Sequence, residues 1–217
     1  MTAPRPGTGP PADDGGFPAG FFDRTDGSPD DDFYAYDRFV THIDDSAIEA
    51  VGALYEELAV RGRVLDLMSS WVSHLRTSPR ELVVLGMNEA ELLANEQASG
   101  RVVHDLNADP ILPFDDSSFD DALCCVSVDY LVRPVEVFAE VGRVLRPGGR
   151  FVVTFSNRCF PTKAIRGWLM TSDVGHVAIV EEYFRRSGAF DDPVAELRTP
   201  PNPAGDPLWG VWARAGQ

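Results

Sequence analysis

Lysine is almost absent from this 217-residue sequence, and so are cysteine and long apolar runs. No apolar run approaches the roughly 18–20 residues that cross a bilayer, which argues against a membrane-spanning helix. The three cysteines lack the CxxC spacing of a metal site, so we expect no bound metal and reduced thiols in a cytoplasmic protein. The amino end also lacks the charged and apolar segments of a signal peptide, so we expect no secretion.

Positive charge is scarce as well. The sequence has 19 basic against 34 acidic side chains, a net charge of −15, which disfavours nucleic acid and anionic membrane surfaces as partners. Residues 1–57 hold 13 acids and 3 arginines, a net of −10, so residues 58–217 carry only −5. We therefore expect a small-molecule partner, with no membrane and no nucleic acid, and leave monomer and homodimer both open.

The first quarter of the chain divides into two segments. Residues 1–32 contain six prolines, six glycines and seven aspartates, a composition that predicts a disordered acidic tail. Residues 33–61 predict an N-terminal helical cap segment, in which the aromatic stretch 33–40 is suited to cover an adjacent cleft. A helix follows it, and Ser46 and Glu49 have the spacing of a capping box at its start.

Residues 62–217 alternate between apolar strands and amphipathic helices. Helical patterns occupy residues 89–96, 134–145 and about 179–187. Strand patterns occupy residues 63–67, 82–85, 101–105, 122–128, 151–155, 194–198 and 208–213. This order predicts an α/β fold: one Rossmann-like, doubly wound, seven-stranded and mostly parallel sheet that closes with a C-terminal antiparallel hairpin.

Two motifs carry a family resemblance. They are LPFDDSSFD at residues 112–120 and VLRPGGRF at residues 144–151, in the order and at about the distance found in one family, and YFRRSGAF at residues 183–190 agrees with them. With these motifs the chain resembles a class I S-adenosylmethionine-dependent methyltransferase of the small-molecule, type 11-like group, over roughly residues 60–217. The resemblance implies S-adenosylmethionine as cofactor and a small molecule as methyl acceptor.

The cofactor loop departs from that family. Asp66 is in place at the end of the first strand, but the three glycines expected two, four and six residues later are Met68, Ser70 and Val72. Glycines there let backbone approach a ligand, so their loss should push the ligand outward or reshape the turn. We expect hydrogen bonds and stacking from the side chains of this loop to replace them: Ser69, Ser70, Trp71, Ser73 and His74.

The resemblance also assigns the nucleoside contacts. Asn88 falls where the family has the acid that binds the ribose, and an amide can still accept one hydrogen bond and donate another. Asp105 and Leu106 resemble the acidic and apolar pair that meets adenine. The expected cofactor-binding residues are Asp66, Met68, Ser69, Ser70, Trp71, Asn88, Asp105, Leu106 and Ser127.

The reacting groups are expected where the fourth and fifth strands end. Methyl transfer mainly needs proximity and alignment, with a base where the acceptor must lose a proton. We expect Asp129 or His74 to serve as that base and Tyr130 to orient the acceptor. The alternative for His74 is a structural histidine.

The segment after the fifth strand predicts the substrate class. Arg158, Lys163 and Arg166 fall within nine residues, directly after Asn157, and Lys163 is the only lysine. Converging there, these four side chains would bind an anionic group such as a carboxylate or phosphate. The alternative is a helix with a solvated basic face.

Three function classes remain open. The first is a small-molecule methyltransferase. The second is an enzyme that uses S-adenosylmethionine without methyl transfer, as a cyclase or lyase, and the third is a cofactor-dead binding protein. Retained Asp66 and Asp105 favour the first two, whereas the lost glycines favour the last two.

Overall fold

The computed structural model describes residues 16–199 and 205–216. Its centre is one seven-stranded sheet in the order β3-β2-β1-β4-β5-β7-β6, in which β7 is antiparallel to both of its neighbours. The strands are β1 (Arg63–Leu67), β2 (Glu81–Gly86), β3 (Gly100–Val103), β4 (Phe119–Cys125), β5 (Leu145–Phe155), β6 (Val194–Leu197) and β7 (Trp209–Arg214). This arrangement confirms the predicted fold class.

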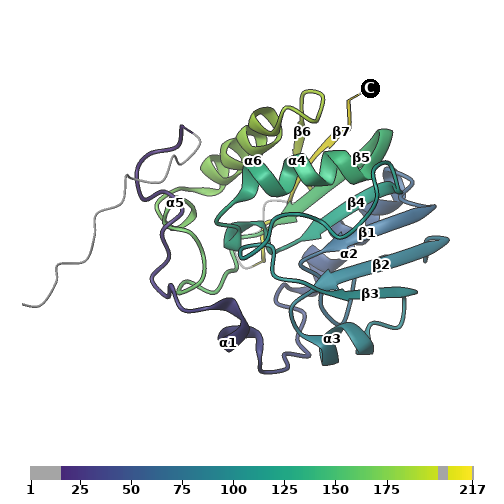
Figure 1. The fold of residues 1–217 in the computed structure, drawn as a ribbon, viewed down its shortest axis with the longest axis horizontal. Coiled ribbons are helices and arrows are strands. Elements are labelled where there is room, and N and C mark those ends of the chain that lie inside the picture. The colour runs from purple at the N-terminus through teal and green to yellow at the C-terminus, as the bar shows by residue number, and fades with distance from the viewer. Residues whose placement is uncertain (1–15, 200–204, 217) are drawn as a thin grey trace, which may run out of the picture.

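Helices cover both faces of the sheet. They are α1 (Asp30–Tyr34), α2 (Asp45–Glu57), α3 (Glu89–Ala94), α4 (Pro134–Val144), α5 (Arg166–Leu169) and α6 (Asp173–Ser187), with a short 3-10 turn at Val128–Tyr130. Figure 1 shows α4 and α6 side by side on one face and α2 on the other. Within the described ranges, no helix is long and apolar enough to cross a membrane.

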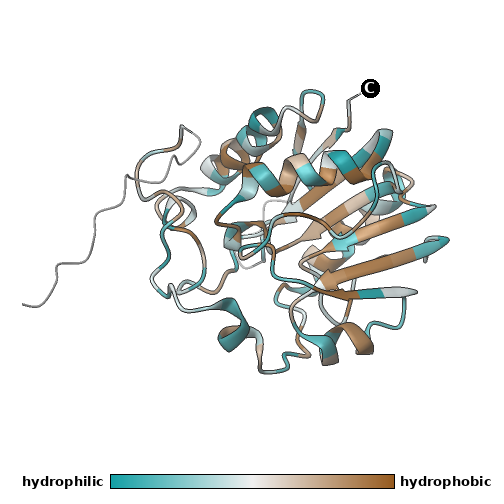
Figure 2. Cartoon of the chain, in the orientation of Figure 1, coloured by the Kyte–Doolittle hydropathy of each residue, from teal (hydrophilic) through white to brown (hydrophobic). Residues whose placement is uncertain are grey.

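The central strands are buried on both faces, as their continuous apolar sequences predict (Figure 2). Side chains alternate along β1: Leu65 and Leu67 join the core under α4 and α6, whereas Val64 joins the core under α2. Asp66 points to the same side as Val64 and is only 3% exposed. The sheet therefore places one acidic side chain in an otherwise apolar layer.

The connection from β1 to β2 has no helix. These strands are parallel, and such a connection usually contains a helix, yet residues 68–80 form an irregular segment. Leu75 packs in the core under α2, and Arg76 pairs with Glu49 and Glu56 of α2 at 2.5 and 2.9 Å. No helix N-terminus therefore follows β1 in this structure.

Local starts and turns differ in detail from the predictions. Asp44, not Ser46, caps α2, because its Oδ1 accepts a hydrogen bond from the Ala47 N–H at 2.8 Å. Helix α6 begins at Asp173, before the predicted start near residue 179. Residues 147–149 of the VLRPGGRF motif lie inside β5, where the pairing register with β4 shifts and Gly148 has a φ of 79°.

The predicted tail, residues 1–32, is folded over the part that the structure describes. Phe17, Phe21 and Phe22 pack against the core and form a ring cluster with Tyr183 of α6. Three half-buried aromatic rings offset part of the ordering entropy that the proline- and glycine-rich composition implies. Residues 1–15 of that predicted tail lie outside the described residues.

Candidate functional site

A pocket opens at the edge of the sheet where the parallel strands end. It includes about 1130 Å³ of empty space, counting solvent at its mouth, and is lined by the carboxyl ends of β1, β2 and β4. Side chains of the N-terminal segment 30–44, here called the cover segment, line its other side. Ligands of open α/β sheets bind at this edge, so the pocket is the candidate site.

The backbone around the pocket is unusually strained. Among the described residues, six other than glycine have a positive φ, and four of these six line the pocket. They are His42 at 63°, Met68 and His74 at 52°, and Val126 at 46°. Such conformations cost about 1–3 kcal/mol each and gather at functional sites, which supports a binding role for this pocket.

Asp66 supplies a free carboxylate oxygen at the pocket. Ser69 Oγ and Ser73 Oγ both donate to its Oδ2, at 2.7 and 2.6 Å. Its Oδ1 accepts no hydrogen bond from the described residues. Burial raises the pKa of Asp66 to about 6, and the two serine hydroxyls partly oppose that rise. This carboxyl group can therefore bind a cation or a hydrogen-bond donor above that pH.

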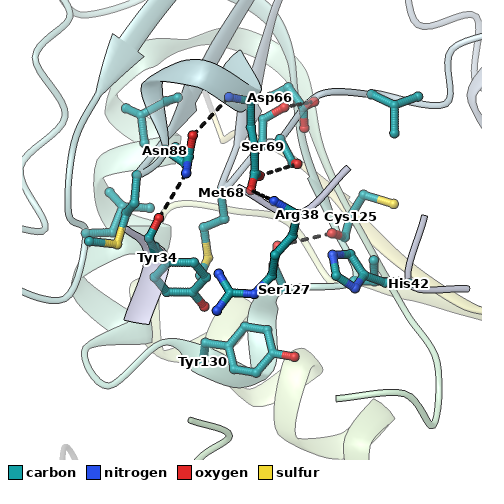
Figure 3. Close-up of a pocket in the computed structure, with 18 of the residues that line it drawn as sticks. Tyr34, Arg38, His42, Asp66, Met68, Ser69, Asn88, Cys125, Ser127 and Tyr130 are labelled. Atoms are coloured by element: carbon teal, nitrogen blue, oxygen red, sulfur yellow. Dashed lines mark hydrogen bonds between the residues drawn. The ribbon is translucent and has the colours of Figure 1, made fainter. Parts of the chain in front are cut away.

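Met68 occupies the first lost glycine position. Its φ of 52° is a conformation that glycine adopts without cost, and its side chain lies within the pocket in Figure 3. Ser70, at the second position, lines the pocket and donates to Glu91 Oε2 at 2.6 Å. The loop thus keeps a glycine-like bend at one position and adds side chains to the pocket.

Asn88 lines the pocket, but its amide is already engaged. Its Oδ1 accepts from the Glu91 N–H at 2.9 Å and caps α3. Its Nδ2 donates to the Tyr34 carbonyl (Figure 3) and to Asp37 Oδ1, both at 3.0 Å. The residue expected at the ribose therefore holds the cover segment in place.

Glu91 provides the carboxylate that Asn88 lacks. It lies on α3 and lines the pocket, where it is 9% exposed. Its Oε1 accepts from the Arg38 N–H at 2.6 Å, and its Oε2 accepts from Ser70 Oγ. Sequence reasoning missed Glu91, since its only signal was an acid in the first turn of a predicted helix.

The cover segment brings several further side chains to the pocket. Tyr34, Arg38 and Val40 of the stretch 33–40 line it, and so does His42. The Arg38 guanidinium lies 4.4 Å from the centre of the Phe33 ring and donates to two carbonyls of the same segment. The guanidinium group therefore interacts with the backbone and an aromatic ring of the cover segment.

Of the four remaining predicted cofactor contacts, two lie in the pocket wall and two do not. Leu106 and Ser127 line the pocket. Asp105 does not, because its Oδ1 accepts two backbone N–H bonds of its own turn, at 2.8 and 3.2 Å. Trp71 does not either, because its Nε1 donates to the Val40 carbonyl at 3.0 Å and so supports the cover segment.

Two of the three expected catalytic side chains line the pocket and the third does not. Tyr130 lines the pocket, and its hydroxyl accepts from the Phe160 N–H at 2.8 Å. His74 lines it too, and burial lowers its pKa. Asp129 is 2% exposed and does not line the pocket, and burial raises its pKa to about 8.

The described parts of the chain contain no group of three or more His, Cys, Asp or Glu side chains that could hold a metal ion.

Lys163 does not reach the pocket. It is fully buried, and its Nζ lies 3.1 Å from Asp30 Oδ1 and 3.3 Å from Asp26 Oδ2. Its Nζ also donates to the Ser28 carbonyl at 2.9 Å. Lys163 therefore pairs with acids of the predicted tail, not with an anionic substrate as the sequence analysis expected.

The rest of the predicted anion site is dispersed. Asn157 is exposed and lies outside the pocket lining. Arg158 Nε donates to Asp206 at 2.7 Å, and Arg166 is an exposed side chain whose Nε contacts the Met170 sulfur at 3.4 Å. The four side chains do not converge, because the short α5 and the N-terminal segment separate and engage them.

Known proteins resemble this chain in sequence and fold. Residues 62–153 match the family described as "Methyltransferase domain". A sterol 4-C-methyltransferase of Caenorhabditis elegans is 38% identical over 76 residues, which is 33% of this chain and 22% of that protein. The alignment thus spans about a fifth of that relative's length.

Two solved structures share the fold. The phosphoethanolamine N-methyltransferase 2 of Haemonchus contortus, solved with S-adenosylmethionine, superposes with a TM-score of 0.53 at 14% identity, covering 82% of this chain and 58% of that one. The [4+2]-cyclase SpnF superposes with a TM-score of 0.55 at 15% identity, covering 78% and 81%. Residues 62–153 therefore match a methyltransferase family, and the sheet of this chain has the fold of these solved structures.

Proposed function

We propose that this chain transfers a methyl group from S-adenosylmethionine to a small-molecule acceptor. The observation that carries this is the pocket at the strand ends, where Asp66 presents an unpartnered carboxylate oxygen beside the Glu91 carboxylate. The family match of residues 62–153 supports the reaction type.

The chemistry of the pocket fits that cofactor. S-adenosylmethionine carries a sulfonium and an ammonium group, a ribose diol and a flat adenine ring. Asp66 and Glu91 offer acceptor oxygens for the positive and hydroxyl groups, and Met87 and Leu106 offer apolar wall for the ring. The one arginine in the wall, Arg38, is engaged within the cover segment, so the pocket favours a cationic ligand.

We assign the ribose contact to Glu91. Asn88 has committed both atoms of its amide, whereas each Glu91 oxygen accepts one hydrogen bond and has capacity for another. A carboxylate gives charge-assisted hydrogen bonds to a diol, which an amide does not. The lost acid at Asn88 is then compensated three residues later, on the first turn of α3.

The bound cofactor would supply an electrophilic methyl carbon that needs only an aligned acceptor. Ser127 and Tyr130, at the end of β4, line the wall where an acceptor would be oriented. The cover segment lines the same pocket. Proximity of this kind provides a large share of the acceleration for an in-line displacement.

We propose a small acceptor without a requirement for negative charge. The cover segment limits the pocket to small ligands, and Arg158, Lys163 and Arg166 are all absent from its lining.

We also propose a cytoplasmic location. The three free cysteines, Cys124, Cys125 and Cys159, support it, since thiols stay reduced there.

A second candidate function is chemistry other than methyl transfer within the same fold. The specific observation in its favour is Met68, which fills part of the space that a glycine would leave open. The structural neighbour named as a [4+2]-cyclase supports this candidate. Such an enzyme would bind its ligand in the same pocket and catalyse a reaction other than methyl transfer.

Product analysis separates the two candidates. The protein is incubated with S-adenosylmethionine, with and without the small-molecule fraction of a cell extract, and products are measured by mass spectrometry. S-adenosylhomocysteine that forms only with extract supports methyl transfer. Methylthioadenosine without extract, or no product with any fraction, contradicts it.

A further inference from the structure

Two histidines from distant parts of the chain meet at the pocket. His42 belongs to the cover segment and His74 to the irregular connection after β1, and both line the pocket. Their φ values of 63° and 52° place both in the left-handed region. Neither position is one where histidine is needed for packing, because His42 is exposed and His74 is half-buried.

Both imidazoles are free of hydrogen bonds to the described residues. The two other histidines are held by backbone carbonyls: the His104 ring bonds to Asp109 at 2.8 Å, and the His176 ring to Trp168 at 2.9 Å. The His42 ring forms a T-shaped contact with the Phe160 ring, with centres 5.3 Å apart. Free ring nitrogens at a pocket wall are available to a ligand.

The surroundings keep both rings neutral near pH 7. Desolvation lowers the pKa of His42, the Glu91 carboxylate raises it, and the Arg38 guanidinium lowers it. Burial and the charge of His42 lower the pKa of His74. The other titratable side chains of the pocket wall are Asp30, Tyr34, Asp66, His104, Cys125 and Tyr130. Neutral imidazoles can accept a proton.

We propose that His42 and His74 are the catalytic bases of this site, and that the acceptor they serve carries a hydroxyl group. This rests on the proposed methyl transfer. A carboxylate or a neutral amine attacks without losing a proton first, whereas a hydroxyl oxygen gains nucleophilicity when a base takes its proton.

The step balances within the site. A bond forms between the acceptor oxygen and the methyl carbon as the bond from carbon to sulfur breaks, and its electron pair stays on sulfur as a neutral thioether. The hydroxyl proton passes to an imidazole nitrogen of the pair. Exposed His42 then returns it to water.

Glycine variants test the pair without disturbing the backbone. His42→Gly and His74→Gly suit a left-handed φ, so loss of activity cannot come from backbone strain. The matched control is Ala59→Gly, which has a φ of 51° and does not line the pocket. S-adenosylhomocysteine formation is measured from pH 6 to 9, with the extract fraction that supports wild-type turnover, with and without added imidazole.

We expect each histidine variant to lose about 100-fold or more in rate, and imidazole to restore part of it. Affinity for S-adenosylhomocysteine, measured by calorimetry, should stay within about threefold, and the control should match the wild type. Full activity in both variants, or loss without rescue, would overturn the proposal. A methylated product whose methyl group is not on oxygen would overturn the hydroxyl assignment.

Proton NMR decides the pairing without turnover. The His74 pKa should rise in His42→Gly, because a neighbouring positive charge is removed. An unchanged His74 titration would contradict the pair. If the wild type binds S-adenosylhomocysteine but transfers no methyl group, the proposed function fails, and the NMR result still decides whether the histidines act on each other.

Discussion

Lys163 Nζ lies 3.1 Å from Asp30 Oδ1, with the lysine side chain fully buried. This ion pair joins the segment after β5 to the first helix of the N-terminal region. Arg24 and Asn107 also donate to the Asp30 carboxylate, at 2.8 Å each. The only lysine of the chain therefore fastens the segment that covers the pocket.

Breaking this pair should be costly. We expect Lys163→Met to lower the free energy of unfolding by about 3 kcal/mol, because it removes one of the two cations that pair with the buried Asp30 carboxylate. Arg166→Met, at an exposed position in the same segment, should change it by less than about 0.5 kcal/mol. Urea unfolding measures both, and equal values would show that the pair is not structural.

Asp66 should give stability a distinct pH dependence. Its pKa is raised to about 6 in the folded protein, so between about pH 4 and pH 6 the folded state binds a proton that the unfolded chain has released. The free energy of unfolding should thus fall by about 2–3 kcal/mol as pH rises through that window. Asp66→Asn should remove this part of the slope in urea unfolding followed at several pH values.

Glycine at position 68 should improve cofactor binding. Met68 already has a glycine-like φ, so Met68→Gly removes a side chain from the pocket without a backbone cost. We expect roughly tenfold tighter binding of S-adenosylhomocysteine by calorimetry, which corresponds to about 1.4 kcal/mol. Ala59→Gly should leave binding unchanged. Weaker binding by Met68→Gly would mean that the thioether holds the ligand.

Glu91 should matter more for binding than its neighbour on α3. Replacing Glu91 by Gln removes the charge that we assign to the ribose, and we expect about tenfold weaker binding of S-adenosylhomocysteine. Glu89→Gln changes an exposed acid on the same helix turn and serves as the control. Equal affinities of the two variants would reject the assignment of Glu91.

The fold was largely predictable because the sequence alternates apolar strand runs with amphipathic helical patterns. The LRPGGRF stretch, for example, forms the first part of β5, and Tyr34, Arg38 and Val40 of the stretch 33–40 line the pocket. Resemblance also led to Leu106 and Ser127 in the pocket wall.

Contacts between distant segments were not predictable. Nothing local in the sequence indicates that Asp30 reaches Lys163, or that Trp71 supports the Val40 backbone instead of a ligand. Glu91 and His42 lacked a motif, since a helical acid and a loop histidine are common on surfaces. Packing between distant segments decides the role of such residues. The irregular segment after β1, for example, places Trp71 against the cover segment and His74 in the pocket wall.

The central claim is that this pocket binds S-adenosylmethionine, and calorimetric titration with S-adenosylhomocysteine tests it most directly. We expect one site per chain with a dissociation constant on the order of micromolar, which weakens in Glu91→Gln. No binding heat at millimolar ligand, with the protein folded, would contradict the claim.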